Sequence, residues 1–297
     1  MKGIDKMAYI GLDIGHGVNT WENGGGKGVE RNGKVYEEHD FNSKIAIATK
    51  ALLEAQGHKV TYGLQQPNSK DMPLTARTNK FNALGVDFVI SMHANAGAES
   101  VDGRCVFYWH DHTNSKKLAE NIVKAIHDKG YSTHGNGLHA SMTGSWTNLH
   151  MVRETKMTAI LIEYGFMTNA KDFEYIFGSK QNQYVKDMAE ATVKGVQAYL
   201  GQSTALKAQN ATVTVSNMFK KGDIVELKPT ATHWIKFYEK VGGTNKGRTY
   251  ISKNLKDAQF KVTYLNSDGT IELAETLNGK ARYAAYERDL VKAELRL

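Results

Sequence analysis

The chain has 297 residues, of which 41% are hydrophobic and 23% charged, as is ordinary for a soluble globular protein. Its length suggests about two domains, and no stretch approaches the roughly 20 apolar residues that span a bilayer. One cysteine, Cys105, excludes an intrachain disulfide and fits synthesis in a reducing cytoplasm. The net charge of +7 is uneven: residues 201–297 hold 16 Lys and Arg against 10 Asp and Glu, leaving 22 against 21 for residues 1–200.

Strand and helix signals alternate over the first 200 residues. An apolar run at residues 8–12 predicts a first strand, which leads into the turn Gly15-His16-Gly17. Apolar and β-branched runs predict further strands at 58–64, 87–94, 104–110 and 158–163. Helical periodicity and glycine stops predict helices that begin near Phe41, Pro73, Leu118 and Val185. This alternation predicts an α/β fold with a mostly parallel twisted sheet flanked by helices.

The composition and the secondary-structure signals change after residue 200. Residues 201–216 are polar, without aromatic side chains or a helical stripe, and are predicted to be a linker. Beyond them, turn signals separate the strand candidates "DIVELK", "QFKVTYL", "TIELAE" and "ARYAAY". We therefore expect a first domain at 1–200, a linker at 201–216, and a small all-β barrel or sandwich at 217–297.

Four ionisable side chains lie near the ends of predicted strands or at the start of a helix. His16 follows the first strand, His93 and Glu163 end later strands, and Glu38 precedes the helix that begins near Phe41. In open parallel sheets, ligands bind beyond the carboxyl ends of the strands. Two histidines and a glutamate leave an open position on zinc, and the second glutamate has the chemistry of a general base.

Other residues compete for these roles. Glu37 and His39 adjoin Glu38, and spacing alone would allow either to replace it. The pair His110 and His112 has a metal-like spacing, although a solvated loop explains it more simply. The Gly/Ser/Thr-rich stretch 131–150, whose role the sequence leaves open, holds three more histidines that would rim a substrate groove or lie in solvent: His134, His139 and His150. Cys105 falls in a strand pattern, which favours a small buried apolar residue over a catalytic thiol.

Four sequence blocks in order resemble the zinc-dependent N-acetylmuramoyl-L-alanine amidases of the amidase-3 family. They are "DIGHG", "EHDFN", "LTARTNKFNALGVDFVISMHAN" and "RETKMTAILIEYGFMTNAKD", within about Ala8 to Leu200. In that family the glutamate ligand lies four residues before an asparagine, which selects Glu38 over Glu37. The chain departs from the family in having Ile14 where a proline is usual, and in residues 131–150, which do not align.

The resemblance implies a peptidoglycan hydrolase that cleaves the amide between N-acetylmuramic acid and the L-alanine of the stem peptide. Zn²⁺ would be held by His16, Glu38 and His93, and Glu163 would be the catalytic residue. No covalent intermediate is needed, so a serine or cysteine nucleophile is not expected.

The segment that begins "FKKGDIVELKPTATHW" resembles bacterial SH3-like cell-wall-binding domains. Its aromatic residues fit a barrel core or a binding groove, and the net charge of +6 over residues 201–297 suits polyanionic partners such as teichoic acids and stem-peptide carboxylates. The first residues do not read as a signal peptide. The expectation is therefore a phage or prophage endolysin that accumulates in the host cytoplasm and then acts on the cell wall, without membrane insertion.

Two rival interpretations belong to other classes. One is a catalytically inactive wall-binding protein. Loss of any of the four site residues would favour this interpretation, but all four are present. The other is a nucleic-acid-binding protein that uses the basic C-terminal domain. The near-neutral first domain, whose strand ends carry histidine and glutamate rather than lysine and arginine, argues against nucleic acid as a partner.

Overall fold

The computed structural model describes residues 7–204 and, beyond them, seven strands between residues 224 and 292. The chain divides into two compact units. The described residues 7–17 and 27–204 belong to the first, and residues 18–26 and the strands from Ile224 onward belong to the second. Of the predicted linker at 201–216, only residues 201–204 lie within the described part. No helix in the described part is both long and apolar enough to cross a membrane.

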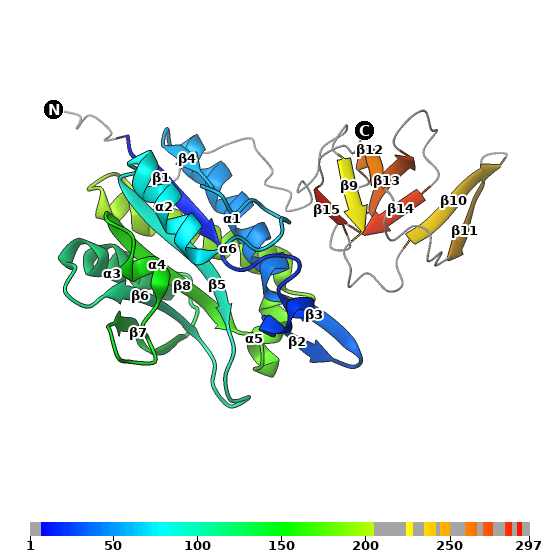
Figure 1. Ribbon diagram of the computed structural model, residues 1–297. Coiled ribbons are helices and arrows are strands. Elements are labelled where there is room, and N and C mark those ends of the chain that lie inside the picture. Colours follow the sequence, from blue (N-terminus) through cyan, green and yellow to red (C-terminus); the bar gives the residue numbers. More distant parts are fainter. Residues whose placement is uncertain are drawn as a thin grey trace. The chain divides into compact units, whose positions relative to one another are not determined.

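A six-stranded sheet forms the centre of the first unit (Figure 1). Its spatial order is β4 (Lys59–Thr61), β1 (Tyr9–Ile14), β5 (Phe88–Asn95), β8 (Thr158–Phe166), β6 (Arg104–Trp109) and β7 (Thr133–Ser141). The first four strands run parallel, β6 runs antiparallel to β8, and β7 runs parallel to β6. The predicted mostly parallel α/β fold is confirmed for this unit.

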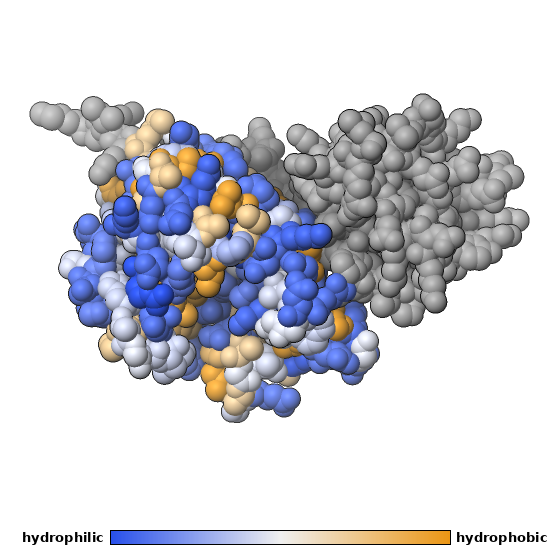
Figure 2. All heavy atoms as spheres, viewed as in Figure 1, coloured by the Kyte–Doolittle hydropathy of each residue, from blue (hydrophilic) through white to orange (hydrophobic). Residues whose placement is uncertain are grey.

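Helices cover both faces of this sheet. One face packs against α1 (Glu38–Ala55), α3 (Thr113–Asp128) and α6 (Gln181–Tyr199), and α5 (Ala170–Ile176) contacts α6 and β8. The other face packs against the shorter α2 (Leu74–Leu84) and α4 (His150–Arg153). The first unit also contains the hairpin of β2 (Gly28–Arg31) and β3 (Lys34–Glu37), whereas the short π-helix η1 (Trp21–Gly25) is assigned to the second unit. The view in Figure 2 shows a mainly hydrophilic surface with scattered apolar patches.

Because side chains alternate along each strand, the residues of the apolar core and the candidate site residues on the strands lie on opposite faces of the sheet. Ile90 and Met92 of β5, like Ile160 and Ile162 of β8, are fully buried in the core beneath α1, α3 and α6. Burying each such side chain stabilises the fold by about 1.5–3 kcal/mol. Successive side chains of a strand point to opposite faces, so His93 and Glu163 lie on the other face of the sheet, which α2 and α4 contact.

The second unit contains an antiparallel sheet. Its strands are β9 (Ile224–Leu227), β10 (Ile235–Val241), β11 (Thr244–Thr249), β12 (Gln259–Leu265), β13 (Thr270–Glu275), β14 (Tyr283–Tyr286) and β15 (Leu290–Lys292). They pair in the order β11-β10-β14-β13-β12-β9-β15. The four strand candidates of the sequence coincide with β9, β12, β13 and β14, whereas closure into an SH3-like barrel stays a prediction.

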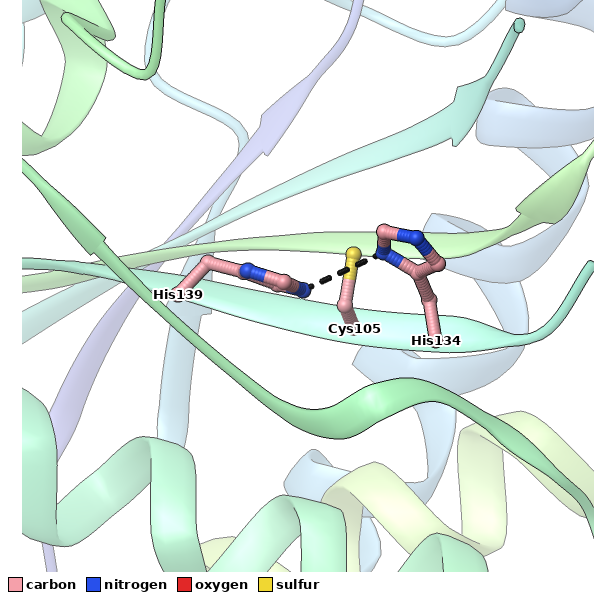
Figure 3. Close-up of side chains that lie close together, drawn as sticks. All are labelled: Cys105, His134 and His139. Carbon is pink, nitrogen blue, oxygen red and sulfur yellow. Dashed lines mark hydrogen bonds between the residues drawn. The ribbon is translucent and has the colours of Figure 1, made fainter. Parts of the chain in front are cut away.

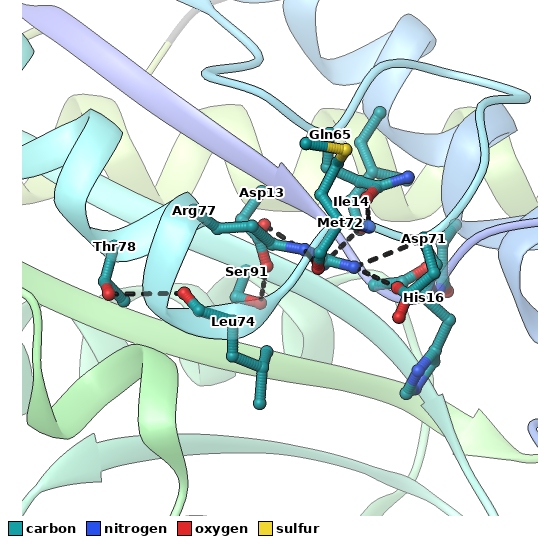
Figure 4. A network of polar contacts seen from close by, with 12 residues as sticks. Asp13, Ile14, His16, Gln65, Asp71, Met72, Leu74, Arg77, Thr78 and Ser91 are labelled. Carbon is teal, nitrogen blue, oxygen red and sulfur yellow. Dashed lines mark hydrogen bonds and ion pairs between the residues drawn. The ribbon is translucent and has the colours of Figure 1, made fainter. Parts of the chain in front are cut away.

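A buried arginine on α2 holds the turn that follows β1 (Figure 4). The Arg77 guanidinium donates to the carbonyl oxygens of Ile14 at 2.9 Å, His16 at 3.4 Å and Met72 at 2.9 Å, and it pairs with Asp71. Its fixed fork of donors therefore ties together backbone segments that a lysine would leave partly unbonded.

The same guanidinium compensates a carboxylate inside the sheet. Arg77 Nη1 lies 3.3 Å from Oδ1 of Asp13, while the Ser91 hydroxyl donates to Asp13 Oδ2 at 2.6 Å. Arg77 is 2% exposed and Asp13 is fully buried. Removal of one member of such a pair leaves an uncompensated buried charge, which is strongly destabilising.

We predict that Arg77→Met lowers the free energy of unfolding by about 3–5 kcal/mol in urea denaturation, because Asp13 loses its cation. Lys171→Met is the matched control, since the Lys171–Asp102 ion pair is exposed and its loss should cost less than about 1 kcal/mol. Equal effects of the two substitutions would contradict the account.

Candidate metal centre and catalytic site

The turn after β1 presents His16 beside His93. Their rings meet edge to face with centroids 4.9 Å apart. The left-handed backbone conformation falls on His16 itself, at φ 60°, and the flanking glycines are needed for space. A Cβ on Gly15 would lie 2.4 Å from the His93 ring, and one on Gly17 would lie 2.0 Å from the backbone nitrogen of Asp71.

Glu38 is the first residue of α1, three residues earlier than the helix start expected near Phe41. Its carboxylate lies between the two histidines, with Oε2 3.1 Å from His16 Nε2 and Oε1 3.0 Å from His93 Nδ1. The structure thus brings together three residues that are separated by 22 and 55 positions in the sequence.

Two further donors fix the Glu38 carboxylate. Asn42, one helical turn later, donates through Nδ2 to Glu38 Oε1 at 3.0 Å and to the Gly15 carbonyl at 3.2 Å. The Ala94 amide donates to the same Oε1 at 3.0 Å. This bonding gives a physical reason for an asparagine four residues after the glutamate, because i and i+4 share one face of a helix.

The electrostatics of the trio favour a charged glutamate and a neutral histidine. Burial alone would raise the pKa of Glu38, but His16 and His93 outweigh burial and hold that pKa well below its usual range. Burial, together with the nearby His16, lowers the pKa of His93 although Glu38 acts to raise it. A carboxylate and a neutral imidazole are the forms that bind metal ions.

Glu163 faces this trio from the adjacent strand. In register it lies opposite His93 of β5 and opposite Cys105 of β6. Its Oε2 atom is buried and has no hydrogen-bond partner among the residues that the structure describes. Burial first, and then the nearby Glu38 carboxylate, raise the pKa of Glu163 well above its usual range. A perturbed carboxyl group beside a cluster of possible ligands is a candidate for proton transfer.

The sequence suggested that Glu163 ends its strand, but the strand continues beyond it. β8 continues to Phe166, and both Tyr164 and Phe166 are buried. The pairing of β5 with β8 shifts register just after His93 and Glu163, so both side chains lie where the regular ladder stops.

The donor set fits a metal ion. One donor atom from each of His16, Glu38 and His93 lies within 4.8 Å of the other two. Two imidazoles and one carboxylate form the ligand set of catalytic zinc sites that keep one position open.

The competing candidates have other contacts. His39 contacts the Gly15 carbonyl through Nδ1 at 2.8 Å, and Glu37 ends strand β3, so neither replaces Glu38 between the two histidines. His112 caps α3 by accepting from the Ser115 amide at 3.2 Å. His150 Nε2 contacts the Thr78 hydroxyl at 3.2 Å and joins α4 to α2.

Sequence reasoning missed two features near the site. Arg77 lay inside an ordinary helical pattern, and only its proximity to the buried Asp13 reveals its function. The stretch 131–150, whose role the sequence left open, contains strand β7, whose His134 and His139 lie beside Cys105. The alternation of "HGNGLHAS" is interrupted by glycines, so it gave no clear strand signal.

Comparison with known proteins decides the family. The family model described as N-acetylmuramoyl-L-alanine amidase matches residues 10–198, which is most of the chain. The chain belongs to this family. The matched residues include all four candidate site residues, and the match ends at the close of α6.

Individual amidases agree with this assignment. The chain is 27% identical over 195 residues to the N-acetylmuramoyl-L-alanine amidase CwlM of Bacillus licheniformis, covering 64% of this chain and 68% of that protein. It is similar to the crystal structure of an N-acetylmuramoyl-L-alanine amidase from Clostridium difficile 630, at 26% identity and a TM-score of 0.55, covering 66% and 97% of the two chains. The catalytic domain of CwlV from Bacillus (Paenibacillus) polymyxa, at 24% identity and a TM-score of 0.54 over 66% and 100% of the chains, shows the same fold.

We predict that Gly15→Ala weakens the binding of a metal ion at this candidate site at least tenfold, because the added Cβ displaces the His93 ring. Zinc affinity is measured by competition with a chelating dye. Gly85→Ala is the control: it has a left-handed φ of 60° but open space around its Cβ, so it strains the backbone without reaching the site. Unchanged zinc affinity in Gly15→Ala would contradict the prediction.

Proposed function

We propose that this chain is a zinc-dependent peptidoglycan hydrolase, which cleaves the amide between N-acetylmuramic acid and the L-alanine of the stem peptide. Family membership supports the reaction. The observation that carries the proposal is the Glu38 carboxylate between His16 and His93, with Glu163 on the neighbouring strand.

In this proposal His16, Glu38 and His93 hold the zinc ion. When bound, zinc acts as a Lewis acid toward the scissile carbonyl and makes water a stronger nucleophile at neutral pH. Asn42 and the Ala94 amide keep the Glu38 carboxylate oriented, and Arg77 keeps the His16 turn in place. Such supporting contacts commonly change metal affinity or activity by about 10–100-fold when they are removed.

Glu163 moves the proton. As a carboxylate it accepts a proton from the attacking water while the water oxygen bonds to the amide carbon. It then donates that proton to the alanine nitrogen as the carbon–nitrogen bond breaks. The products are a free lactyl carboxylate on the sugar and a new amino terminus on the peptide. The unpartnered Oε2 of Glu163 is available for this exchange.

The direct test is release of new L-alanine amino termini from purified Gram-positive walls. We expect release to stop after removal of metal by a chelator and to return when zinc is restored. Release of reducing sugars instead would indicate a different bond, and no release of either product would favour an inactive wall-binding protein.

We predict that Glu163→Gln lowers the rate of amide hydrolysis by about 10²–10⁴-fold, since the amide side chain cannot take up the proton. Zinc content should stay at the wild-type level, because Glu163 is not one of the three proposed ligands. Glu120→Gln, an exposed position on α3, is the control and should hydrolyse walls normally. Loss of zinc together with activity would instead make Glu163 a ligand.

We further propose that residues 217–297 form an SH3-like domain that binds the cell wall. Support comes from the antiparallel strands described there and from the net charge of +6 over residues 201–297. A cationic surface attracts anionic polymers such as teichoic acids. The endolysin role, with accumulation in a host cytoplasm before lysis, stays a prediction from the sequence.

For this second unit, we predict that the full chain carrying Glu163→Gln cosediments with intact Gram-positive walls, and that raised salt releases it, because salt screens exposed charges. Walls stripped of teichoic acid are the control and should retain less protein. Wall binding that depends on neither the salt concentration nor the teichoic acid would contradict an electrostatic interaction with an anionic polymer.

A further inference from the structure

A second set of metal-binding side chains lies on the face of the sheet that carries Glu163. Cys105 of β6 and His134 and His139 of β7 each place a donor atom within 4.8 Å of the other two. Figure 3 shows the Cys105 sulfur beside the contact between the two imidazoles. Cys105 is fully buried, whereas both histidines are only half-buried, so the cluster is open on the side of β7.

The backbone explains how these residues meet. The pairing of β6 with β7 passes directly from Arg104↔Thr133 to Val106↔Leu138, so residues 134–137 form an excursion opposite Cys105. Gly135 and Gly137 adopt left-handed φ values of 59° and 78°, which the excursion requires. His139 pairs with Phe107, two residues beyond Cys105, and therefore lies on the same face of the sheet.

Aromatic neighbours fix both imidazoles. The His139 ring stacks on Phe107 at 5.2 Å, and the His134 ring meets Phe166 edge to face at 5.3 Å. His134 Nδ1 and His139 Nε2 are 3.3 Å apart. Two nitrogens bound to zinc at about 2.0–2.1 Å with a tetrahedral angle lie about 3.3 Å from each other. The pair is therefore already spaced as two ligands of one ion.

We propose that Cys105, His134 and His139 form a second metal site, which takes a thiolate-preferring divalent cation of the zinc class. On binding, the Cys105 thiol releases its proton to solvent and a sulfur–metal bond forms. The contact between the imidazoles is replaced by two nitrogen–metal bonds, and the fourth position faces the open side. Because Cys105 lies opposite Glu163 in the sheet, the second ion would sit next to the residue proposed to move the proton.

Cobalt(II) is the probe, because a bound thiolate gives a strong near-ultraviolet charge-transfer band. Cys105 is the only cysteine of the chain, so the band reports this site alone. We expect the metal-free full chain to bind two equivalents of Co²⁺ and to develop the band. Glu38→Gln should lose one equivalent and keep the band, while Cys105→Ala should lose one equivalent and the band.

Substitution of the histidines keeps the test decisive if Cys105→Ala folds poorly. His139→Gln should abolish or strongly weaken the band, whereas His150→Gln, a half-buried histidine outside the cluster, should keep it. A folded wild-type chain with no band at several equivalents of Co²⁺ would overturn the proposal, as would a band that survives His134→Gln combined with His139→Gln. Both results are independent of wall hydrolysis, so this proposal and the hydrolase proposal fail separately.

Discussion

The site depends on one buried carboxylate. Glu38 accepts hydrogen bonds from Asn42 and from the Ala94 amide, and it lies within about 3 Å of His16 and His93. An ionised carboxylate in this environment is costly unless it is paired or bound to a metal. The first turn of α1, the end of β5 and the glycine turn after β1 are therefore constrained together by the need to surround it.

The sheet makes this arrangement possible because its two faces differ. The face beneath α1, α3 and α6 is apolar and closely packed, and it supplies most of the stability. The opposite face carries the polar row His93, Glu163 and Cys105 across three adjacent strands, and α2 and α4 pack against its apolar residues. Arg77 contributes from α2 by balancing Asp13 and holding the His16 turn. Stability and chemistry thus use alternate residues of the same strands.

Much of this could be predicted from the sequence, since strand alternation and helical periodicity are local. The α/β fold follows from the alternation of strand and helix signals. Positions at strand ends and at a helix start made His16, Glu38 and His93 candidates, and the family resemblance selected Glu38 over its neighbours. The bonds of Arg77 and the meeting of Cys105 with His134 and His139 were not predictable in this way. They depend on the antiparallel insertion of β6 beside β8 and on a glycine-rich excursion in β7, neither of which has a local sequence signature.

The central claim is that the first metal ion binds between His16, Glu38 and His93. X-ray absorption at the zinc edge, on full chain loaded with one equivalent of zinc, tests it most directly. If zinc binds between these three residues, its neighbours should be nitrogen and oxygen atoms only, at about 2.0–2.2 Å. A sulfur neighbour at about 2.3 Å in that sample would contradict it, because the tighter ion would then be held by Cys105.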